Sequence, residues 1–466
     1  MGRRWKQAKQ EWLWVATAEL PRSASHPCYS KLNEILDEAG FDEFVEAQCA
    51  GFYADRMGRP SLAPGIYFRA LLVGYLEGID SERGIAWRAS DSLSIRHFLR
   101  VGLDEQVPDH STLSRNRRLI SLGTHQAVFA WVLGILAGRQ LLKGKVIGVD
   151  ATTLEANAAL RSIVRRDTGE TYQEFLVRLA KGSGIETPTR EQLSKLDRHR
   201  AKKGSNETWE SPSDPDARIT KMKDGRTHLA HKAEHAVDME TGAIVAVTLQ
   251  AADQGDTTTI RETVAEAGER IAETAARAPR QLVNPTGPQA VVTDKGYHSR
   301  QVVHELQQAG IRTYISEPAR GRQRWKSAVA QQQAVYANRR RIRGDHGKAL
   351  LRQRGEKLER WNHHLYDRGG MRRVHLRGRD NILKRLVVHA SAGNLGLLLR
   401  SLCGAGTPKG WQGLRCAFEL LLRLLHWAMM QMHQVSAPRE VTPGRSCTPL
   451  HHARVCLPRT RPQATN

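Results

Sequence analysis

The 466-residue sequence has few cysteines and no long apolar run. Its 6 cysteines are scattered without a C-x-x-C pair, which argues against a disulfide framework or a zinc site and is typical of a reducing compartment. The most apolar stretches, 127–138 and 420–430, are too short to cross about 30 Å of hydrocarbon. The basic first residues lack the apolar segment of a signal peptide. We therefore expect a cytoplasmic protein with no membrane partner.

Acidic residues are also fewer than basic ones. The chain has 48 Asp and Glu against 71 Lys and Arg, a formal net charge of +23. A chain this basic repels itself unless it meets a polyanion, so nucleic acid is the first partner to consider. Hydrophobic residues make up 40 % of the chain, which is enough for a buried core and excludes wholesale disorder.

Helical periodicity dominates the N-terminal part. A helical lead-in over 1–60 precedes a compact helical domain over 61–138, predicted from apolar residues that recur at helical spacing. The last part of this domain starts a helix at a Ser-Thr pair and carries Arg115, Arg117 and Arg118. These arginines fit a helix-turn-helix-like DNA contact and fit an ordinary solvated helix face equally well.

The central part alternates strands and helices. This alternation predicts an α/β fold, with a mixed sheet flanked by helices. The expected domain spans 139–400, with a polar and partly mobile insertion at about 160–220, a helical segment over 401–435 and a mobile basic tail over 436–466. The predicted elements are a strand at 145–150, a hairpin at 228–237 and 243–249, a helix at 257–276, a strand at 290–294, a helix at 299–309 and a strand at 311–315.

Two aspartates stand at the predicted ends of buried strands, Asp150 in KVIGVDAT and Asp294 in AVVTDKGYHS. Functional groups of α/β sheets gather at the carboxyl ends of strands. An acid directly after four apolar residues costs desolvation free energy unless a cation neutralises it. Either one alone is better explained as a strand-ending cap, but two in matching contexts indicate a divalent cation site.

A third carboxylate is expected from the basic region between 339 and 385. Glu356 and Glu359 lie three apart in RGEKLERWNHHLY, on one broad face of a predicted helix. A Glu among arginines on a helix is usually an exposed ion-pair partner, and this is the alternative for whichever of the two is not a ligand.

Several blocks together resemble a known family. VPDHSTLSRNRR, KVIGVDATTLEANAA, AVVTDKGYHS and RGEKLERWNHHLYDRGGMRRVHLRGRDNILKR are similar to the conserved blocks of bacterial insertion-sequence transposases of the DDE type. The resemblance covers nearly the whole chain and implies an RNase H-like catalytic core behind the N-terminal helical domain. It also implies a bacterial, nucleoid-associated enzyme.

The resemblance assigns the catalytic and metal-binding roles to Asp150, Asp294 and Glu359, with Glu356 as the alternative. Relatives of this kind usually carry an aromatic residue where this chain has Asn362. Three carboxylates suit two Mg²⁺ or Mn²⁺ ions, which activate a water or a 3′-OH and stabilise the leaving oxygen.

The implied reaction is phosphodiester hydrolysis at the ends of an insertion sequence, followed by strand transfer into target DNA. No phosphate-binding G-x-x-x-x-G-K-[ST] loop is present, so no nucleotide cofactor is expected. The expected partners are the terminal inverted repeats, target DNA and a second copy of the chain in a homodimer. The alternative is a catalytically decayed copy that only binds DNA. The expected DNA-binding residues are Arg115, Arg117, Arg118, Lys295, Arg352, Arg360, Arg372 and Arg373.

Overall fold

A computed structural model of the chain describes residues 26–413, apart from 55–60, 201–203, 223, 279–281, 320, 322, 324, 326 and 327. Contacts divide the chain into one unit over 1–414 and a second over 415–466. The predicted tail at 436–466, and most of the predicted helical segment at 401–435, lie outside the described residues.

The N-terminal region is helical, as predicted. Its helices begin at well-formed caps: the side chains of Ser81, Ser92, Asp109 and Ser121 each accept a backbone N–H of the first turn. The elements are α1 (Pro27–Glu38), α2 (Phe41–Cys49), η1 (Ala50–Phe52), α3 (Pro64–Glu77), α4 (Glu82–Asp91), α5 (Leu93–Leu99), α6 (His110–Leu119) and α7 (Leu122–Gly138).

Helix α6 presents two of its three arginines to solvent. Arg115 and Arg118 are exposed, whereas the Arg117 side chain is 9 % exposed and forms an ion pair with Glu82 at the start of α4. Arg117 therefore has an acidic partner within the helical region, and its role in DNA binding stays a prediction. A bend of 95° separates α6 from α7.

The sheet follows an RNase H-like order. Strand β5 pairs antiparallel with β1 on one edge and with β6 and β4 on the other, while β7 and then β8 add parallel to β1. Without β4, the strands stand across the sheet as third, second, first, fourth and fifth in chain order. The bounds are β1 (Val146–Glu155), β4 (Arg218–Lys221), β5 (Thr227–Asp238), β6 (Ile244–Ala251), β7 (Ala290–Thr293) and β8 (Arg312–Ile315).

Strand β1 is longer than the sequence predicts. It continues past Asp150 to Glu155, because the residues from Asp150 on still pair with β5 in unbroken register. Asp150 therefore lies within its strand, whereas Asp294 directly follows β7, as expected.

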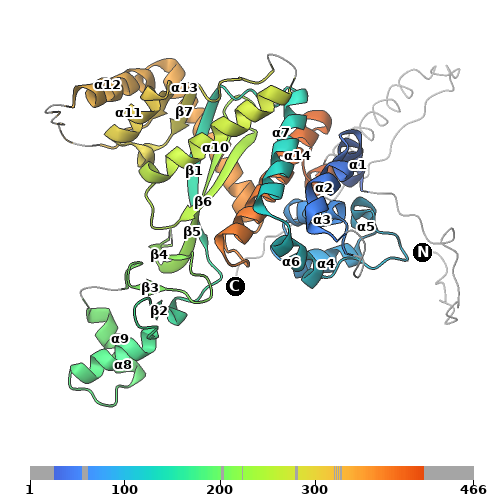
Figure 1. Ribbon diagram of the computed structural model, residues 1–466. Coiled ribbons are helices and arrows are strands. Elements are labelled where there is room, and N and C mark those ends of the chain that lie inside the picture. The colour runs from blue at the N-terminus through green and yellow to red at the C-terminus, as the bar shows by residue number, and fades with distance from the viewer. Residues whose placement is uncertain are drawn as a thin grey trace, which may run out of the picture. The chain divides into compact units, whose positions relative to one another are not determined.

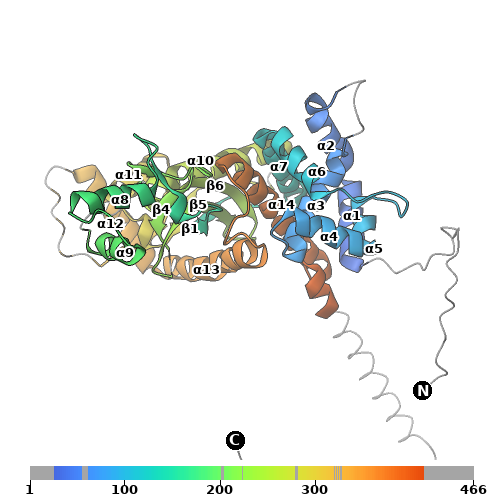
Figure 2. The same cartoon turned by 90° about the horizontal axis from the view of Figure 1, so that it is seen from below.

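Helices cover both faces of the sheet. Figure 2 shows α10 (Asp256–Arg277) and α13 (Asp345–Asn362) on opposite sides of β1 and β5. The long helix α14 (Arg379–Cys403) contacts β6, α3 and α7 (Figure 1) and so joins the sheet to the N-terminal helices. It is apolar enough to span a membrane, but 72 % of its apolar window is buried inside the protein, as in a core helix. The remaining elements are η3 (Lys295–Tyr297), α11 (Arg300–Gln308), α12 (Val329–Arg343) and the π-helix η4 (His363–Arg368).

The insertion at about 160–220, predicted to be polar and partly mobile, contains helices and a pair of short strands. Helices α8 (Tyr172–Gly182) and α9 (Arg190–His199) each begin with a capping box, at Thr171 and Thr189 respectively. They share a small apolar cluster, and the other elements are η2 (Leu160–Ser162), β2 (Val164–Arg165) and β3 (Trp209–Glu210).

Candidate active site

Strand register places the two predicted aspartates side by side. Strands β1 and β7 are parallel neighbours, and their last pair is Gly148 with Val292. Asp150 and Asp294 each lie two residues further along, so they stand level on adjacent strands and on the same face. The spacing of two short apolar runs, each ending in an acid, therefore brings the carboxylates together.

Helix α13 supplies two side chains that reach Asp150. The guanidinium of Arg354 donates from Nη2 to Asp150 Oδ1 at 2.7 Å and lies 3.9 Å from Asp294 Oδ2. The Asn362 amide donates from Nδ2 to Asp150 Oδ2 at 2.7 Å. Between them Leu358 packs toward Gly148, where an added Cβ would lie 3.1 Å from Leu358 Cδ1. One helical stripe thus holds Asp150 through both carboxylate oxygens.

The predicted glutamates lie on another stripe of the same helix. Glu359 follows Leu358 directly and so points roughly 100° away around the helix, and Glu356 points roughly 160° away. Both are exposed. Among the described residues no three His, Cys, Asp or Glu side chains gather closely enough to hold a metal ion. The structure brings together Asp150 and Asp294 but neither glutamate, and the role of Glu359 stays a prediction.

A buried polar network supports the turn after Asp294. Glu234 on β5 is fully buried and accepts hydrogen bonds from Tyr297 at 2.8 Å and Thr259 at 2.9 Å, and another from Thr263. Burial raises the pKa of Glu234, while the hydroxyl donors oppose that shift. The same burial, with Glu234 beside it, raises the pKa of Tyr297. The network fixes Tyr297, and with it the turn that carries Asp294.

Gly296 leaves room between two carboxylates. A Cβ added there would lie 3.1 Å from Asp294 Oδ1 and 2.6 Å from Asp256 Oδ2, so a side chain at this position would clash with both. Asp256, at the start of α10, is already neutralised by the buried Lys232, whose Nζ lies 2.6 Å from Asp256 Oδ1. Among the described residues, Arg354 is the cation that forms ion pairs with Asp150 and Asp294.

A neutral histidine lies beside the site. His235 is directly opposite Asp150 on β5, is fully buried, and its Nδ1 lies 3.4 Å from the hydroxyl of Tyr366. Burial, and then the charge of Arg354, lower the pKa of His235 to about 3. The imidazole is therefore uncharged near neutral pH and leaves Arg354 as the cation next to Asp150.

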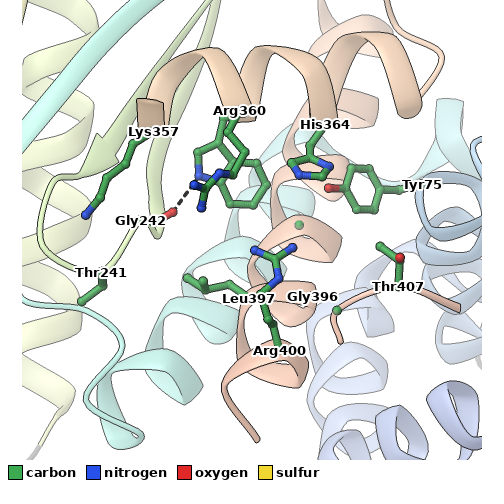
Figure 3. Close-up of a pocket in the computed structure, with 13 residues that line it drawn as sticks. Tyr75, Thr241, Gly242, Lys357, Arg360, His364, Gly396, Leu397, Arg400 and Thr407 are labelled. Atoms are coloured by element: carbon green, nitrogen blue, oxygen red, sulfur yellow. Dashed lines mark hydrogen bonds between the residues drawn. The ribbon is translucent and has the colours of Figure 1, made fainter. Parts of the chain in front are cut away.

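A basic pocket opens on the third side of α13 (Figure 3). Arg360 and His364 approach it from α13 and η4, and Arg400 approaches it from α14. Lys357 lies at its edge, where the ammonium donates to the backbone carbonyls of Met239 and Glu240. It encloses about 60 Å³, and its lining contains no Asp or Glu. Within the described part of the chain, neither Arg360 nor Arg400 has a salt-bridge partner. Burial, and then Arg400 and the other nearby cations, lower the pKa of His364 to about 4.

The other predicted DNA-binding residues lie on several different elements. Arg372 donates to Thr152, two residues beyond Asp150 on β1, at 2.7 Å and also pairs with Asp367 at 2.5 Å. The remaining ones are exposed: Lys295, Arg352 and Arg373, together with Arg115 and Arg118 on α6.

Comparison with family models identifies the family of this chain. A model described as transposase domain (DUF772) matches residues 19–119, and a model described as transposase DDE domain matches residues 146–395, more than half of the chain. The chain belongs to the DDE transposase family. No curated protein gives a significant match.

One solved structure is similar to this DDE transposase. It is the Mos1 transposase paired-end complex with the left transposon end, at 10 % identity, covering 68 % of this chain and 82 % of that one with a TM-score of 0.17. The fold assignment therefore depends on the strand order and on the family model.

The residues that sequence reasoning missed are Arg354, Asn362 and Glu234. A clue to Glu234 was available, because it is a charged residue within a strand that is almost entirely buried. Asn362 had one too, because it departs from the family pattern. The donor set fits a hard divalent cation in part: two carboxylates converge, and the Asn362 Oδ1 beside them is buried without a hydrogen-bond partner in the described structure.

Proposed function

We propose that this DDE transposase binds the ends of an insertion sequence and catalyses divalent-metal-dependent cleavage and strand transfer of DNA. The observation that carries the proposal is the pairing of Asp150 with Asp294 on adjacent parallel strands, bridged by a cation from Arg354. Two carboxylates at this spacing attract a divalent ion more strongly than the single charge of an arginine side chain.

The chain's own groups prepare the reaction. Mg²⁺ or Mn²⁺, when bound, lowers the pKa of the attacking water and neutralises charge on the leaving oxygen. Asp150 and Asp294 would hold the ion, and the Glu234–Tyr297 contact keeps the Asp294 turn in place. Gly296 keeps the approach to Asp294 open to a DNA strand.

The basic residues position the DNA backbone. The pocket between α13, η4 and α14 brings Arg360 and Arg400 together without a carboxylate in its lining. A phosphate group matches this charge. Each phosphate neutralised in this way makes affinity fall with salt, with a log–log slope of about −0.9 per contact.

A second candidate has one observation in its favour. Neither Glu359 nor Glu356 approaches the aspartates, and a transposase without a third ligand is a decayed copy that still binds DNA. A chain of this kind keeps end binding and shows no strand cleavage with any divalent metal.

Cleavage and joining assays separate these functions. DNA flanking the coding region supplies the candidate ends, a supercoiled plasmid supplies the target, and Mg²⁺ or Mn²⁺ is added. The wild-type chain is expected to nick the ends and form joined product, whereas a plain nuclease leaves no joined product. Asp150→Asn should reduce cleavage at least ~10³-fold with end binding nearly unchanged. Glu273→Gln, an exposed acid on α10, is the matched control. Equal cleavage by wild type and Asp150→Asn would contradict the proposal.

A further inference from the structure

We infer that a groove beside the basic pocket holds an unpaired DNA strand next to the bond that is cut. The inference rests on the proposed function and deepens it, because it names the form of DNA that this part of the chain grips. The groove lies between the N-terminal helices, η4 and the segment 407–412. Tyr75, His364 and Thr407 line both the groove and the basic pocket, so the two cavities adjoin. Figure 3 shows these three residues on the side of the pocket away from Lys357.

Positive charge outweighs negative charge along the groove. Arg368 on η4 and Lys409 line it, are exposed and have no salt-bridge partner within the described part of the chain. Among the described lining residues the one acid is Glu77, which pairs with Arg88 at 3.2 Å and accepts a hydrogen bond from Tyr29 at 2.6 Å. Because the charge of Glu77 is already compensated, the groove continues the positive potential of the basic pocket.

His364 stands where the two cavities adjoin and reports the charges of both. Burial, and then the charges of Arg400 and Arg368, lower the pKa of His364 to about 4. Arg400 lines the basic pocket and Arg368 lines the groove. Like charges held this close repel one another in the free protein. A ligand with successive phosphates, running from one cavity into the other, relieves that repulsion.

The groove is too small for a double helix. It encloses about 510 Å³. Cavities of roughly 300–1,000 Å³ hold one drug-sized molecule, so roughly one or two nucleotides of a single strand fit. Proteins bind single strands in grooves that combine positive charge with aromatic side chains. Tyr29, Tyr75 and His26 supply aromatic rings to the lining of this groove.

The groove begins a short way from the acidic site. Asn362 contacts Asp150 at the end of α13, and His364 and Arg368 follow two and six residues later in the chain. At roughly 1.5 Å per residue they lie about 3 and 9 Å further along the helix axis. One strand of DNA advances about 3.4 Å per nucleotide, so the groove receives the strand within roughly three nucleotides of the cut. A paired end has to open there before one strand enters.

Binding of a single strand tests the inference. The probe is a short fluorescent oligothymidylate, its affinity for the full-length chain is measured by anisotropy, and EDTA keeps the acidic site free of metal. Arg368→Ala combined with Lys409→Ala should weaken this binding at least ~10-fold, because two phosphate contacts are lost. Binding of a duplex of the same length should change less than ~2-fold.

A second variant removes no cation. Gln412→Glu adds a negative charge at an exposed position in the lining of the groove and should weaken single-strand binding at least ~3-fold. It carries the test if the double variant does not fold, which circular dichroism shows.

Matched controls carry the same changes outside the groove. Arg139→Ala combined with Lys181→Ala, and Gln308→Glu on α11, alter exposed residues and should bind both probes within ~2-fold of wild type. The inference is overturned if the folded groove variants bind the single strand as wild type does, or if they lose duplex and single-strand binding equally. Tighter binding of oligouridylate than of oligothymidylate would also overturn it, because the occupant would then be RNA.

A cleavage assay distinguishes failure of this inference from failure of the proposed function. Wild type should cut end fragments with a short unpaired stretch at the cleavage site at least ~5-fold faster than fully paired ones, because the cost of unpairing is already met. The groove variants should reduce that difference. If wild type cuts both fragments equally fast, cleavage stands and only the groove loses its role. If wild type binds neither DNA probe and cuts neither fragment, both fail.

Discussion

Two faces of helix α13 carry opposite electrostatic tasks. The face toward the sheet presents Arg354 and Asn362 to a pair of carboxylates, so one cation meets two acids. The face toward α14 presents Arg360 to a pocket whose lining holds cations and no acid. The first face lacks positive charge and the second lacks negative charge.

Under the proposed function, a single helix serves both a metal ion and a polyanion. A divalent cation then neutralises the acids that the first face contacts, and a backbone phosphate pairs with the cations of the second. The exposed stripe with the glutamates lies between them and is tied to neither. Mutations on the three stripes should therefore have effects of different kinds and sizes.

The largest effect should come from removing the metal. Addition of EDTA should reduce strand cleavage to background, at least ~10³-fold, because Asp150 and Asp294 then hold only Arg354. DNA binding, measured by gel shift in the same buffer, should persist because the α14 face needs no metal. Readdition of Mg²⁺ should restore cleavage. Loss of binding together with cleavage would break the division between the two faces.

The next effect concerns the basic pocket. Arg360→Ala combined with Arg400→Ala should weaken DNA binding roughly 10- to 100-fold and make the slope of log affinity against log salt shallower by roughly 1–2. Arg139→Ala, an exposed arginine after α7, is the control and should change neither quantity much. Mn²⁺ affinity should remain that of wild type, and a tenfold change in it would show that the two faces are coupled.

Loss of the network behind the acidic site should cost stability. Glu234→Leu removes a buried acceptor and leaves three hydroxyl donors to find others, which should lower the free energy of unfolding by roughly 1–3 kcal/mol. Urea denaturation of wild type and variant measures this. Glu269→Leu, at an exposed position of α10, should cost less than ~0.5 kcal/mol. Equal losses would mean that Glu234 has no special role in holding the Asp294 turn.

A smaller effect should appear on lowering the pH. The pKa of His364 is about 4 in the free protein because of burial and the cations Arg400, Arg368, His363 and Arg360. A phosphate in the pocket raises the pKa of His364, so the protein takes up a proton when DNA binds. The affinity for DNA should therefore rise as the pH falls toward 4. The rise is up to ~10-fold for each unit by which the phosphate raises the pKa. Comparing the pH dependence of binding in wild type and His364→Gln isolates this contribution. Identical curves would place the phosphate elsewhere.

The smallest effect is expected at the solvent stripe. Glu359→Gln should change cleavage less than ~3-fold, because its side chain projects away from the aspartates. The same cleavage assay as for Asp150→Asn measures it. A ~10³-fold loss would instead restore the glutamate predicted from the family resemblance, and would require α13 to turn by about 100° in the DNA complex.

The sequence predicted most of the sheet because its signals are local. Short, mostly apolar runs before Asp150 and Asp294, and a turn glycine at Gly242, mark strands and a hairpin by composition alone. The full length of β1 was not predicted, because its second half alternates polar and apolar residues and is fixed by pairing with β5. The ion pair of Arg117 with Glu82 was not predicted, because a partner so far away in the sequence leaves no trace in the local pattern.

The side chains of α13 that contact Asp150 were the hardest part of the site to predict. Two glutamates among arginines drew attention, but which stripe of a helix faces the sheet depends on where Leu358 packs, and that is a tertiary contact. The one local clue was Asn362, where the chain departs from its relatives. Only the folded structure shows that the Asn362 amide contacts Asp150.

Iron-directed cleavage tests the central claim most directly. Fe²⁺ bound in place of Mg²⁺, with ascorbate and peroxide, generates hydroxyl radicals that cut the polypeptide near the ion, and mass spectrometry locates the cuts. The account predicts cuts around Asp150 and Asp294 together, suppressed by excess Mg²⁺ and absent in Asp150→Asn. Cuts at neither aspartate, or cuts that persist unchanged in Asp150→Asn, would contradict a metal site between these two strands.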